Sequence, residues 1–278
     1  MVQTGWYVPR EPPADLADML VCSWIAEPSG VHRLVPDGCM DLLRTSNGDV
    51  WLCGPETTAW TFELPTQTKA VGVRFRSGMG AIFAGIDAST IVNKRIRIEN
   101  VNTRAHQIHI REHTSSGRKK DSMRLLELEG FVRRVVTDQH WIDAVASDRQ
   151  FATSVLLRLT HAPRLKQNQL ANELGMSVRQ LHRASRRCFG YGLATLARLL
   201  RFQRFLALIH VAKSKVGRAQ LSATAIEAGY SDHAHLVRDC RAITSQTPSQ
   251  FLQDYFPTFP DMSDPYKTGK LFAVSMAL

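Results

Sequence analysis

Four polar side chains recur along the predicted helix 178–188 at spacings that place them on one face. They are Arg179, His182, Arg183 and Arg186. A guanidinium bonds both acceptors of a guanine edge, and an imidazole donates to or accepts from a base edge, so Arg179, His182 and Arg183 are candidates for contact with bases in the DNA major groove. Arg186 and Arg187 are predicted to contact phosphates, and Gln180 a phosphate or a water molecule.

A second predicted helix, from about 232 to 243, carries the other candidate contacts. They are His233, Ala234, Val237, Arg238 and Arg241. The small apolar side chains suit the methyl group of thymine, and the arginines suit the DNA backbone. His233 and His235 lie two residues apart and point to different faces, with no third ligand nearby, so no metal site is predicted. The chain has no GxSxG, HExxH or P-loop pattern, and neither a catalytic residue nor a cofactor is predicted.

One arrangement of helices occurs twice around these two sets of candidates. The arrangement appears at 170–183 and again at 225–238. It consists of a short helix with an inner alanine, a glycine turn, and a second helix that begins with a polar residue. The glycine permits the turn, the alanine lets two helices cross closely, and the second helix presents its N-terminal side chains to base edges. Two copies joined by a long helix at about 193–211 predict two helix-turn-helix motifs.

The positive charge of the chain is concentrated around the same motifs. The 278 residues have a net charge of +10, and residues 158–241 alone contain fifteen lysines and arginines against four acidic residues. Such a block is typical of a protein that binds a polyanion, because each phosphate contact releases counterions. Arg198, Arg201 and Arg204 recur every three residues on the long helix. The sequence leaves open whether they follow the DNA backbone or face solvent.

The C-terminal part of the chain resembles the AraC/XylS family of bacterial transcription regulators. The resemblance covers roughly 155–255 and is carried by 170–204 and, more specifically, by 225–251, which holds the family's second helix-turn-helix signature. It implies an all-α module of about seven helices that places two recognition helices in successive major-groove segments. The chain departs from the family pattern at Ser185 and Cys240, where a core phenylalanine is usual, and at Ser245, where glycine is usual.

The first hundred residues are predicted to be mostly β, as a small barrel or sandwich-like domain. Asn47-Gly48 is predicted to form a type I′ hairpin turn, 71–76 a half-buried strand and 15–20 a short helix. The stretches 34–42, 53–55 and 71–78 are similar to an N-terminal domain that is joined to this module in some regulators, and that similarity implies no defined ligand. Candidate ligand-binding residues are Asp37, Asp41 and Arg74; the alternative for the aspartates is a turn and a helix cap.

The predicted fold is therefore an α+β protein of two domains. The expected division is 1–105 for a sensor or dimerisation domain, 106–160 for a helical linker, 161–256 for the DNA-binding domain and 257–278 for a tail. Residues 102–120 are expected to form a helix followed by a loop. Further helices are expected at 123–136 and 143–160, and Ser222 is expected to cap a helix at 223–228. The five widely spaced cysteines predict free thiols, and the absence of a signal peptide or an 18-residue apolar run predicts a cytoplasmic protein without a membrane span.

Three functions remain open at this point. The first is a sequence-specific transcription regulator that binds double-stranded DNA, with RNA polymerase, a small effector and a second copy of the chain as further partners. The second is a DNA-binding interaction protein without a small ligand. The third is a DNA-repair enzyme fused to a helix-turn-helix module, which would require four closely spaced cysteines that this chain lacks.

Overall fold

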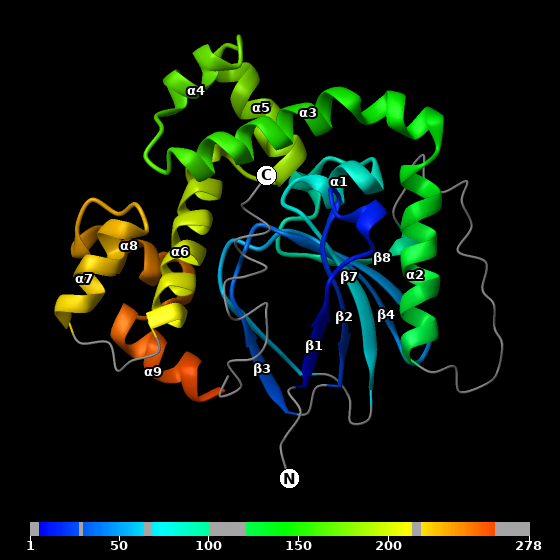
Figure 1. Ribbon diagram of the computed structural model, residues 1–278, viewed down its shortest axis with the longest axis horizontal. Helices are drawn as coiled ribbons and strands as arrows, with labels where there is room; N and C mark the ends of the chain where they lie inside the picture. The colour runs from blue at the N-terminus through cyan, green and yellow to red at the C-terminus, as the bar shows by residue number, and fades with distance from the viewer. Residues whose placement is uncertain (1–5, 28–29, 64–67, 101–120, 213–217, 259–278) are drawn as a thin grey trace.

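The computed structural model describes residues 6–27, 30–63, 68–100, 121–212 and 218–258. A β-rich N-terminal part is followed by a helical C-terminal part (Figure 1). The strands of the described residues are β1 (Tyr7–Arg10), β2 (Leu20–Ala26), β3 (Val31–Leu34), β4 (Met40–Thr45), β5 (Val50–Cys53), β6 (Trp60–Glu63), β7 (Ala70–Phe75) and β8 (Arg95–Arg97). The helices are α1 (Met79–Ala84), α2 (Asp121–Val136), α3 (Gln139–His161), α4 (Gln167–Glu173), α5 (Val178–Phe189), α6 (Leu193–Ala212), α7 (Arg218–Glu227), α8 (His233–Thr244) and α9 (Pro248–Thr258). Three short 3-10 helices are η1 (Ala14–Leu16), η2 (Ala88–Thr90) and η3 (Ile98–Asn100).

The strands form two antiparallel sheets. Six strands follow the order β1-β2-β7-β4-β5-β8, and β3 pairs with β6 in a separate ribbon. The large sheet is not closed into a barrel, and the sandwich-like alternative is the one that fits. The expectation of a mostly β N-terminal domain and a helical C-terminal module is confirmed.

The large sheet has one face covered by helices and another that faces a cavity. On the covered face α2 packs along β2 and β7, and the hydroxyl of Ser23 donates a buried hydrogen bond to Glu129 of α2. On the other face Gly72 leaves room for the indole of Trp24, since a Cβ at that glycine would lie 2.3 Å from the ring. The predicted strand at 71–76 exists, but it is central in the sheet and almost wholly buried rather than half-buried.

Two local predictions in the β region are wrong in detail. The hairpin between β4 and β5 forms, but only Gly48 of its turn has positive φ, so the turn is not type I′. The N–H of Gly48 bonds to Thr45, and the glycine itself takes the left-handed conformation, which is a type I turn followed by a bulge. The expected helix at 15–20 shortens to η1, because β2 begins at Leu20.

The helical part follows the predicted order. The long helix α6 joins the pair α4–α5 to the pair α7–α8 in the chain, and α7 and α8 lie beside it (Figure 1). The helices expected at 123–136 and 143–160 are α2 and α3, and α3 ends before Pro163. Ser222 is not a cap, since α7 begins four residues earlier and Ser222 lies inside it. The helix and loop expected at 102–120 lie outside the described residues.

The β region and the first helix pair are packed directly on each other. A Cβ at Gly78, which has φ +81°, would lie 2.8 Å from the ring of Phe189 at the end of α5. A Cβ at Gly190, which has φ +87°, would lie 2.7 Å from Val92 and 2.9 Å from Pro55. One hydrophobic core therefore runs from the sheet into the helical part. The expected boundaries at 105/106, 160/161 and 256/257 stay predictions.

Candidate nucleic-acid interface and a cavity in the β region

The turn, the helix cap and the buried face of the helix pair α4–α5 are set by particular residues. Gly175, at φ +64°, makes the turn between the helices. Ser177 accepts a hydrogen bond from the N–H of Gln180, and the Gln180 side chain accepts in return from the N–H of Ser177, which is a capping box. Leu181 and Ala184 are buried against the neighbouring helices, so the rotation of α5 about its axis is set by packing.

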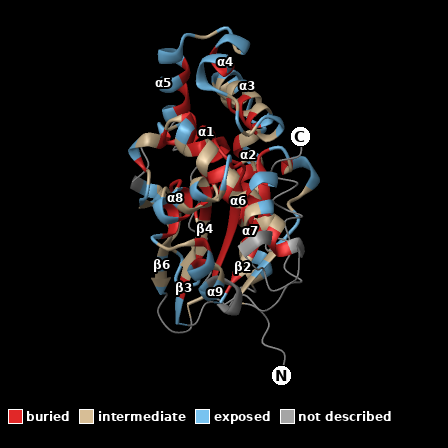
Figure 2. Cartoon of the chain, turned by 90° about the vertical axis from the view of Figure 1, so that its left-hand side faces the viewer, coloured by how far each residue is buried: buried red, intermediate tan, exposed pale blue. Residues whose placement is uncertain are grey.

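The opposite face of α5 carries the predicted contacts. These residues are exposed: Arg179, Gln180, His182, Arg183, Arg186 and Arg187. Figure 2 shows exposed and buried residues alternating along α5 and α8. Within the described residues Arg179, Arg183 and Arg186 form no ion pair and no hydrogen bond. Their guanidinium groups are therefore available to an anion from outside the chain.

Two of the predicted contacts on α5 have other partners. The Gln180 side chain completes the capping box through its oxygen. Arg187 forms a double ion pair with Asp148 of α3, and this carboxylate raises the pKa of the Arg187 guanidinium. Both residues thus hold α5 in place, and a phosphate contact at Arg187 would have to compete with Asp148.

The second pair, α7–α8, has the same construction. Gly229, at φ +100°, makes the turn, and Asp232 caps α8 by accepting from the N–H of His235, which lowers the pKa of Asp232. Ala234, Arg238 and Arg241 of the predicted set are exposed. The other two members, His233 and Val237, are half-buried.

An acidic residue that sequence reasoning missed holds α8 to α6. Asp239 is 6% exposed and lies 3.3 Å from Arg198 Nε, 3.3 Å from Arg201 Nη2 and 3.6 Å from His235 Nε2. Both arginines are therefore engaged by Asp239, and the Arg198 side chain is also partly exposed to solvent. The sequence contained one signal: Asp239 is the only acid within α8, and the arginines of α6 recur at helical spacing.

These contacts distinguish two groups of arginines within the basic block. The first group is used inside the protein: Arg158 pairs with Glu173, Arg164 bonds to the carbonyls of Gly229 and Tyr230, and Arg187, Arg198 and Arg201 have the partners given above. The second group makes no ion pair within the described chain and lies exposed on the two second helices: Arg179, Arg183, Arg186, Arg238 and Arg241. The unpaired positive charge of these helices therefore faces outward.

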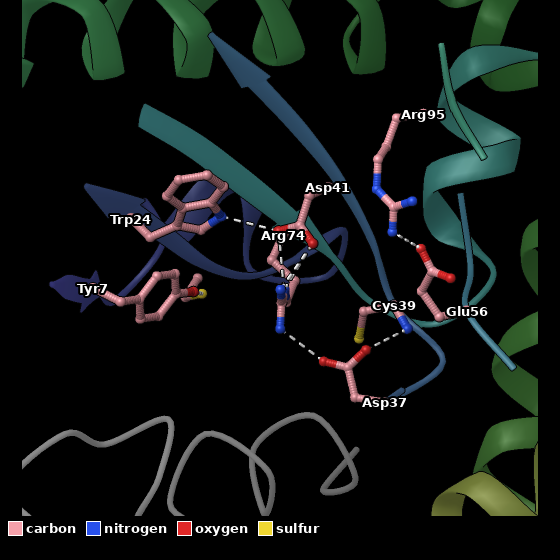
Figure 3. A network of polar contacts seen from close by, with 9 residues as sticks. Tyr7, Trp24, Asp37, Cys39, Asp41, Glu56, Arg74 and Arg95 are labelled. Carbon is pink, nitrogen blue, oxygen red and sulfur yellow. Dashed lines mark hydrogen bonds and ion pairs between the residues drawn. The ribbon is translucent and has the colours of Figure 1, made fainter. Parts of the chain in front are cut away.

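The other face of the large sheet borders a cavity of about 460 Å³. The three predicted ligand-binding residues, Asp37, Asp41 and Arg74, all line it. Arg74 lies opposite Asp41 across the β4–β7 pair; its Nε and Nη2 donate to that carboxylate at 2.8–3.1 Å, and its Nη1 donates to Asp37 at 2.8 Å. In Figure 3 the guanidinium lies between the two carboxylates, with Tyr7 and Trp24 to one side of it.

Aromatic side chains and a second ion pair complete the wall. The indole N–H of Trp24 donates to Asp41 at 2.9 Å. Arg95 pairs with Glu56, and its guanidinium carbon lies 3.3 Å from the ring centroid of Trp60. Burial raises the pKa of Glu56, and the opposing effect of Arg95 is smaller.

The cysteines are not placed for reaction. All five are free. Burial raises the pKa of Cys22, Cys53 and Cys188 to about 12 and that of Cys240 to about 11. A reactive thiol has a lowered pKa, so these side chains are protonated, structural groups at neutral pH. Among the described residues no group of three or more His, Cys, Asp and Glu side chains is arranged to hold a metal ion.

The β ribbon beside the cavity also touches the end of α8. The carbonyl of Ile243 accepts from the N–H of Ala59 at 2.6 Å, and the carbonyl of Thr244 accepts from the guanidinium of Arg33. These carbonyls belong to the last turn of α8, where a helix cannot satisfy its own acceptors. The ribbon β3–β6 therefore caps the second helix of the second pair.

Two families match parts of the chain. Residues 10–97 match a family described as a domain of unknown function (DUF6597), and residues 170–254 match a family described as a helix-turn-helix domain. The second match runs from within α4 to within α9 and confirms that this part of the chain is a helix-turn-helix domain. No curated protein matches the chain.

Several solved structures resemble the chain loosely. ToxT from Vibrio cholerae O395 is 12% identical with a TM-score of 0.41, over 81% of this chain and 96% of that one. ToxT from the same strain bound to (E)-4-(8-methylnaphthalen-1-yl)but-3-enoic acid is 11% identical with a TM-score of 0.39, over 81% of this chain and 97% of that one. An apo ToxT variant from strain SCE256 is 10% identical with a TM-score of 0.43, over 88% and 99%. In the described part of this chain, none of the helices has the length and apolarity that crossing a membrane requires.

Proposed function

We propose that the chain is a DNA-binding transcription regulator of the AraC type, which contacts DNA with α5 and α8 of its C-terminal helix-turn-helix domain under the control of a small molecule held in the β region. The observation that carries the proposal is the set of unpaired arginines on the exposed faces of these two helices. Base contacts are assigned to Arg179, His182 and Arg183 on α5 and to His233, Ala234 and Val237 on α8. Phosphate contacts are assigned to Arg186, Arg238 and Arg241.

The cap on α8 supports control from the cavity. Arg33 and Ala59, which hold the end of α8, are the chain neighbours of Leu34 and Trp60, which line the cavity. A second link joins Gln203 of α6 to the carbonyl of Pro36, another lining residue, at 2.6 Å. A ligand that binds more tightly when the ribbon β3–β6 is in one position would favour that position and the orientation of α8 that goes with it. The ratio of its affinities for the two positions sets the size of this shift in population.

This proposal involves no catalytic step. RNA polymerase and a second copy of the chain belong to it as expected partners, and a bacterial, cytoplasmic location belongs to it as well. Whether transcription rises or falls depends on where the DNA site lies relative to a promoter.

A charge-matched pair of variants tests the assignment of base contacts. Arg183 on α5 and Arg134 on α2 are both exposed arginines. On a duplex selected from random sequences, Arg183→Ala should lose about 1–3 kcal/mol of binding free energy, or roughly 5- to 150-fold in affinity, and relax the preference at one base pair. Arg134→Ala should change little on any duplex. An equal loss for both variants, or an equal loss of Arg183→Ala on selected and random duplexes, would contradict base contact at Arg183.

A further inference from the structure

The loop that leads into the first helix pair also holds the turn of the second pair. The loop is 162–166, between α3 and α4, and the turn is 228–232, between α7 and α8. We propose that Arg164, in this loop, is a positioning residue that fixes the distance between the two DNA boxes that the protein recognises. The inference rests on the proposed DNA contacts of α5 and α8.

Arg164 contacts the second pair through two donors of one guanidinium. Its Nε donates to the carbonyl of Gly229 at 3.2 Å, and its Nη2 donates to the carbonyl of Tyr230. The two acceptors belong to consecutive residues, so the planar guanidinium sets the direction of the turn as well as its distance from the loop. A lysine ammonium has no such planar fork and would not set that direction.

Close packing accompanies these hydrogen bonds. A Cβ at Gly229 would lie 2.9 Å from the Cβ of Pro163, so the backbone of the turn lies directly against the loop. Arg201 of α6 contacts the same two segments. Its Nη1 donates to the carbonyl of Pro163 at 3.4 Å, and its guanidinium carbon lies 5.7 Å from the ring centroid of Tyr230. The loop, the turn and α6 therefore meet at one junction, formed by Pro163, Arg164, Arg201, Gly229 and Tyr230.

The junction is connected to both recognition helices. On one side the turn ends at Asp232, which caps α8 directly before His233 and Ala234. On the other side the loop follows α3, and the ion pair between Asp148 and Arg187 holds α3 to α5. A movement at the junction would therefore change the position of the base-contacting end of α8 relative to α5.

Two helices in a fixed relation can contact two boxes at one spacing only. Each base pair of B-DNA advances the duplex by about 3.4 Å and rotates it by about 35°. A box displaced by that amount no longer faces its helix, and the loss of one good base contact already lowers affinity roughly 5- to 150-fold. The advantage of binding through two motifs is lost when the geometry forbids simultaneous contact. The junction thus makes the spacing of the boxes a part of what the protein recognises.

Duplexes of altered spacing test this property in the full-length protein. They carry the two selected boxes at the selected spacing, or with one base pair added or removed between them, and binding is measured by fluorescence anisotropy. The unaltered protein should bind each displaced duplex about tenfold more weakly, or weaker still. This ratio is the spacing penalty.

Two variants of Arg164 connect the spacing penalty to the junction. Arg164→Met keeps an apolar stem and removes both donors, and Arg164→Lys keeps the positive charge without the planar fork. Both should reduce the spacing penalty to about threefold or less, because α8 could then follow a displaced box. Both should bind a duplex that carries only the α5 box as tightly as the unaltered protein does.

Lys166→Met is the matched control, since it removes one positive charge from an exposed position of the same loop outside the junction. It should keep the full spacing penalty. Arg164 is itself exposed, so both of its variants should fold, as checked by circular dichroism and urea unfolding. A relaxed spacing in Lys166→Met equal to that of Arg164→Met would overturn the role of the junction.

Two further results would overturn the inference and leave the proposed DNA contacts intact. One is a full spacing penalty in both Arg164 variants. The other is an equal loss of affinity at every spacing in Arg164→Met, with the salt dependence reduced by about 0.9 and both effects reversed in Arg164→Lys, which would make Arg164 a phosphate contact. The proposed function fails differently: a selection that enriches no box overturns the DNA contacts of α5 and α8, and this inference with them.

Discussion

Replacing Asp239 by asparagine should loosen the second recognition helix while the first stays in place. The substitution keeps the size of the side chain but removes the charge that holds Arg198 and Arg201 of α6. Arg198 is 41% exposed and regains water, so its share of the loss is at most about 1 kcal/mol. Arg201 is 15% exposed, and leaving it beside an uncharged amide should cost about 2 kcal/mol.

The expected destabilisation is therefore about 2–3 kcal/mol, which corresponds to a fall in Tm of roughly 5–10 °C. Urea unfolding and binding to duplexes with one altered box measure the two consequences. The matched control is Glu227→Gln on α7, an exposed acid whose loss changes the net charge by the same amount. Asp239→Asn should lose preference mainly at the box contacted by α8. Stability and preference equal to those of the control would refute the role given to Asp239.

The remaining predictions concern the cap, the packing and the charge. Ser245 ends α8 with φ +63°, a conformation that costs a non-glycine residue about 1–2 kcal/mol. Ser245→Gly should therefore raise the free energy of unfolding by about 1 kcal/mol, whereas Ser249→Gly, inside α9, should lower it. A lower stability of Ser245→Gly in urea unfolding would contradict this strain. Gly78→Ala should destabilise the protein by more than 1 kcal/mol in the same assay, because the glycine has positive φ and a Cβ there would meet Phe189. An unchanged urea midpoint would contradict tight packing between the β region and α5. The logarithm of DNA affinity should fall with the logarithm of salt concentration by about 0.9 for each phosphate contact, measured by fluorescence anisotropy, and a flat dependence would rule out backbone contacts.

Local signals in the sequence predicted the helical module well. Glycines at turns, polar caps such as Ser177 and Asp232, and an apolar stripe along α6 each act within a few residues, so they could be recognised without the fold. The departure at Ser245 also has a structural counterpart, because the residue takes the left-handed conformation for which glycine is usual. The misassigned cap at Ser222 came from a polar residue that fits inside a helix as well as at its start.

Contacts between distant segments could not be predicted. Arg198 and Arg201 needed a partner about 40 residues away, and Arg33 meets the end of α8 more than 200 residues along the chain. The approach of Arg74 to Asp41 depends on the register of β4 against β7, which no single strand encodes. The sequence could name Asp37, Asp41 and Arg74 as candidates, while their arrangement as one ion-paired group beside a cavity required the sheet.

The most direct test of DNA contact by both motifs is a selection of random duplexes on the purified protein at near-physiological salt. Two short boxes about one helical turn apart are expected, with the preference at one box lost in Arg183→Ala and the preference at the other lost in Asp239→Asn. A single box, or salt-sensitive binding of every duplex without enrichment, would contradict simultaneous insertion of α5 and α8.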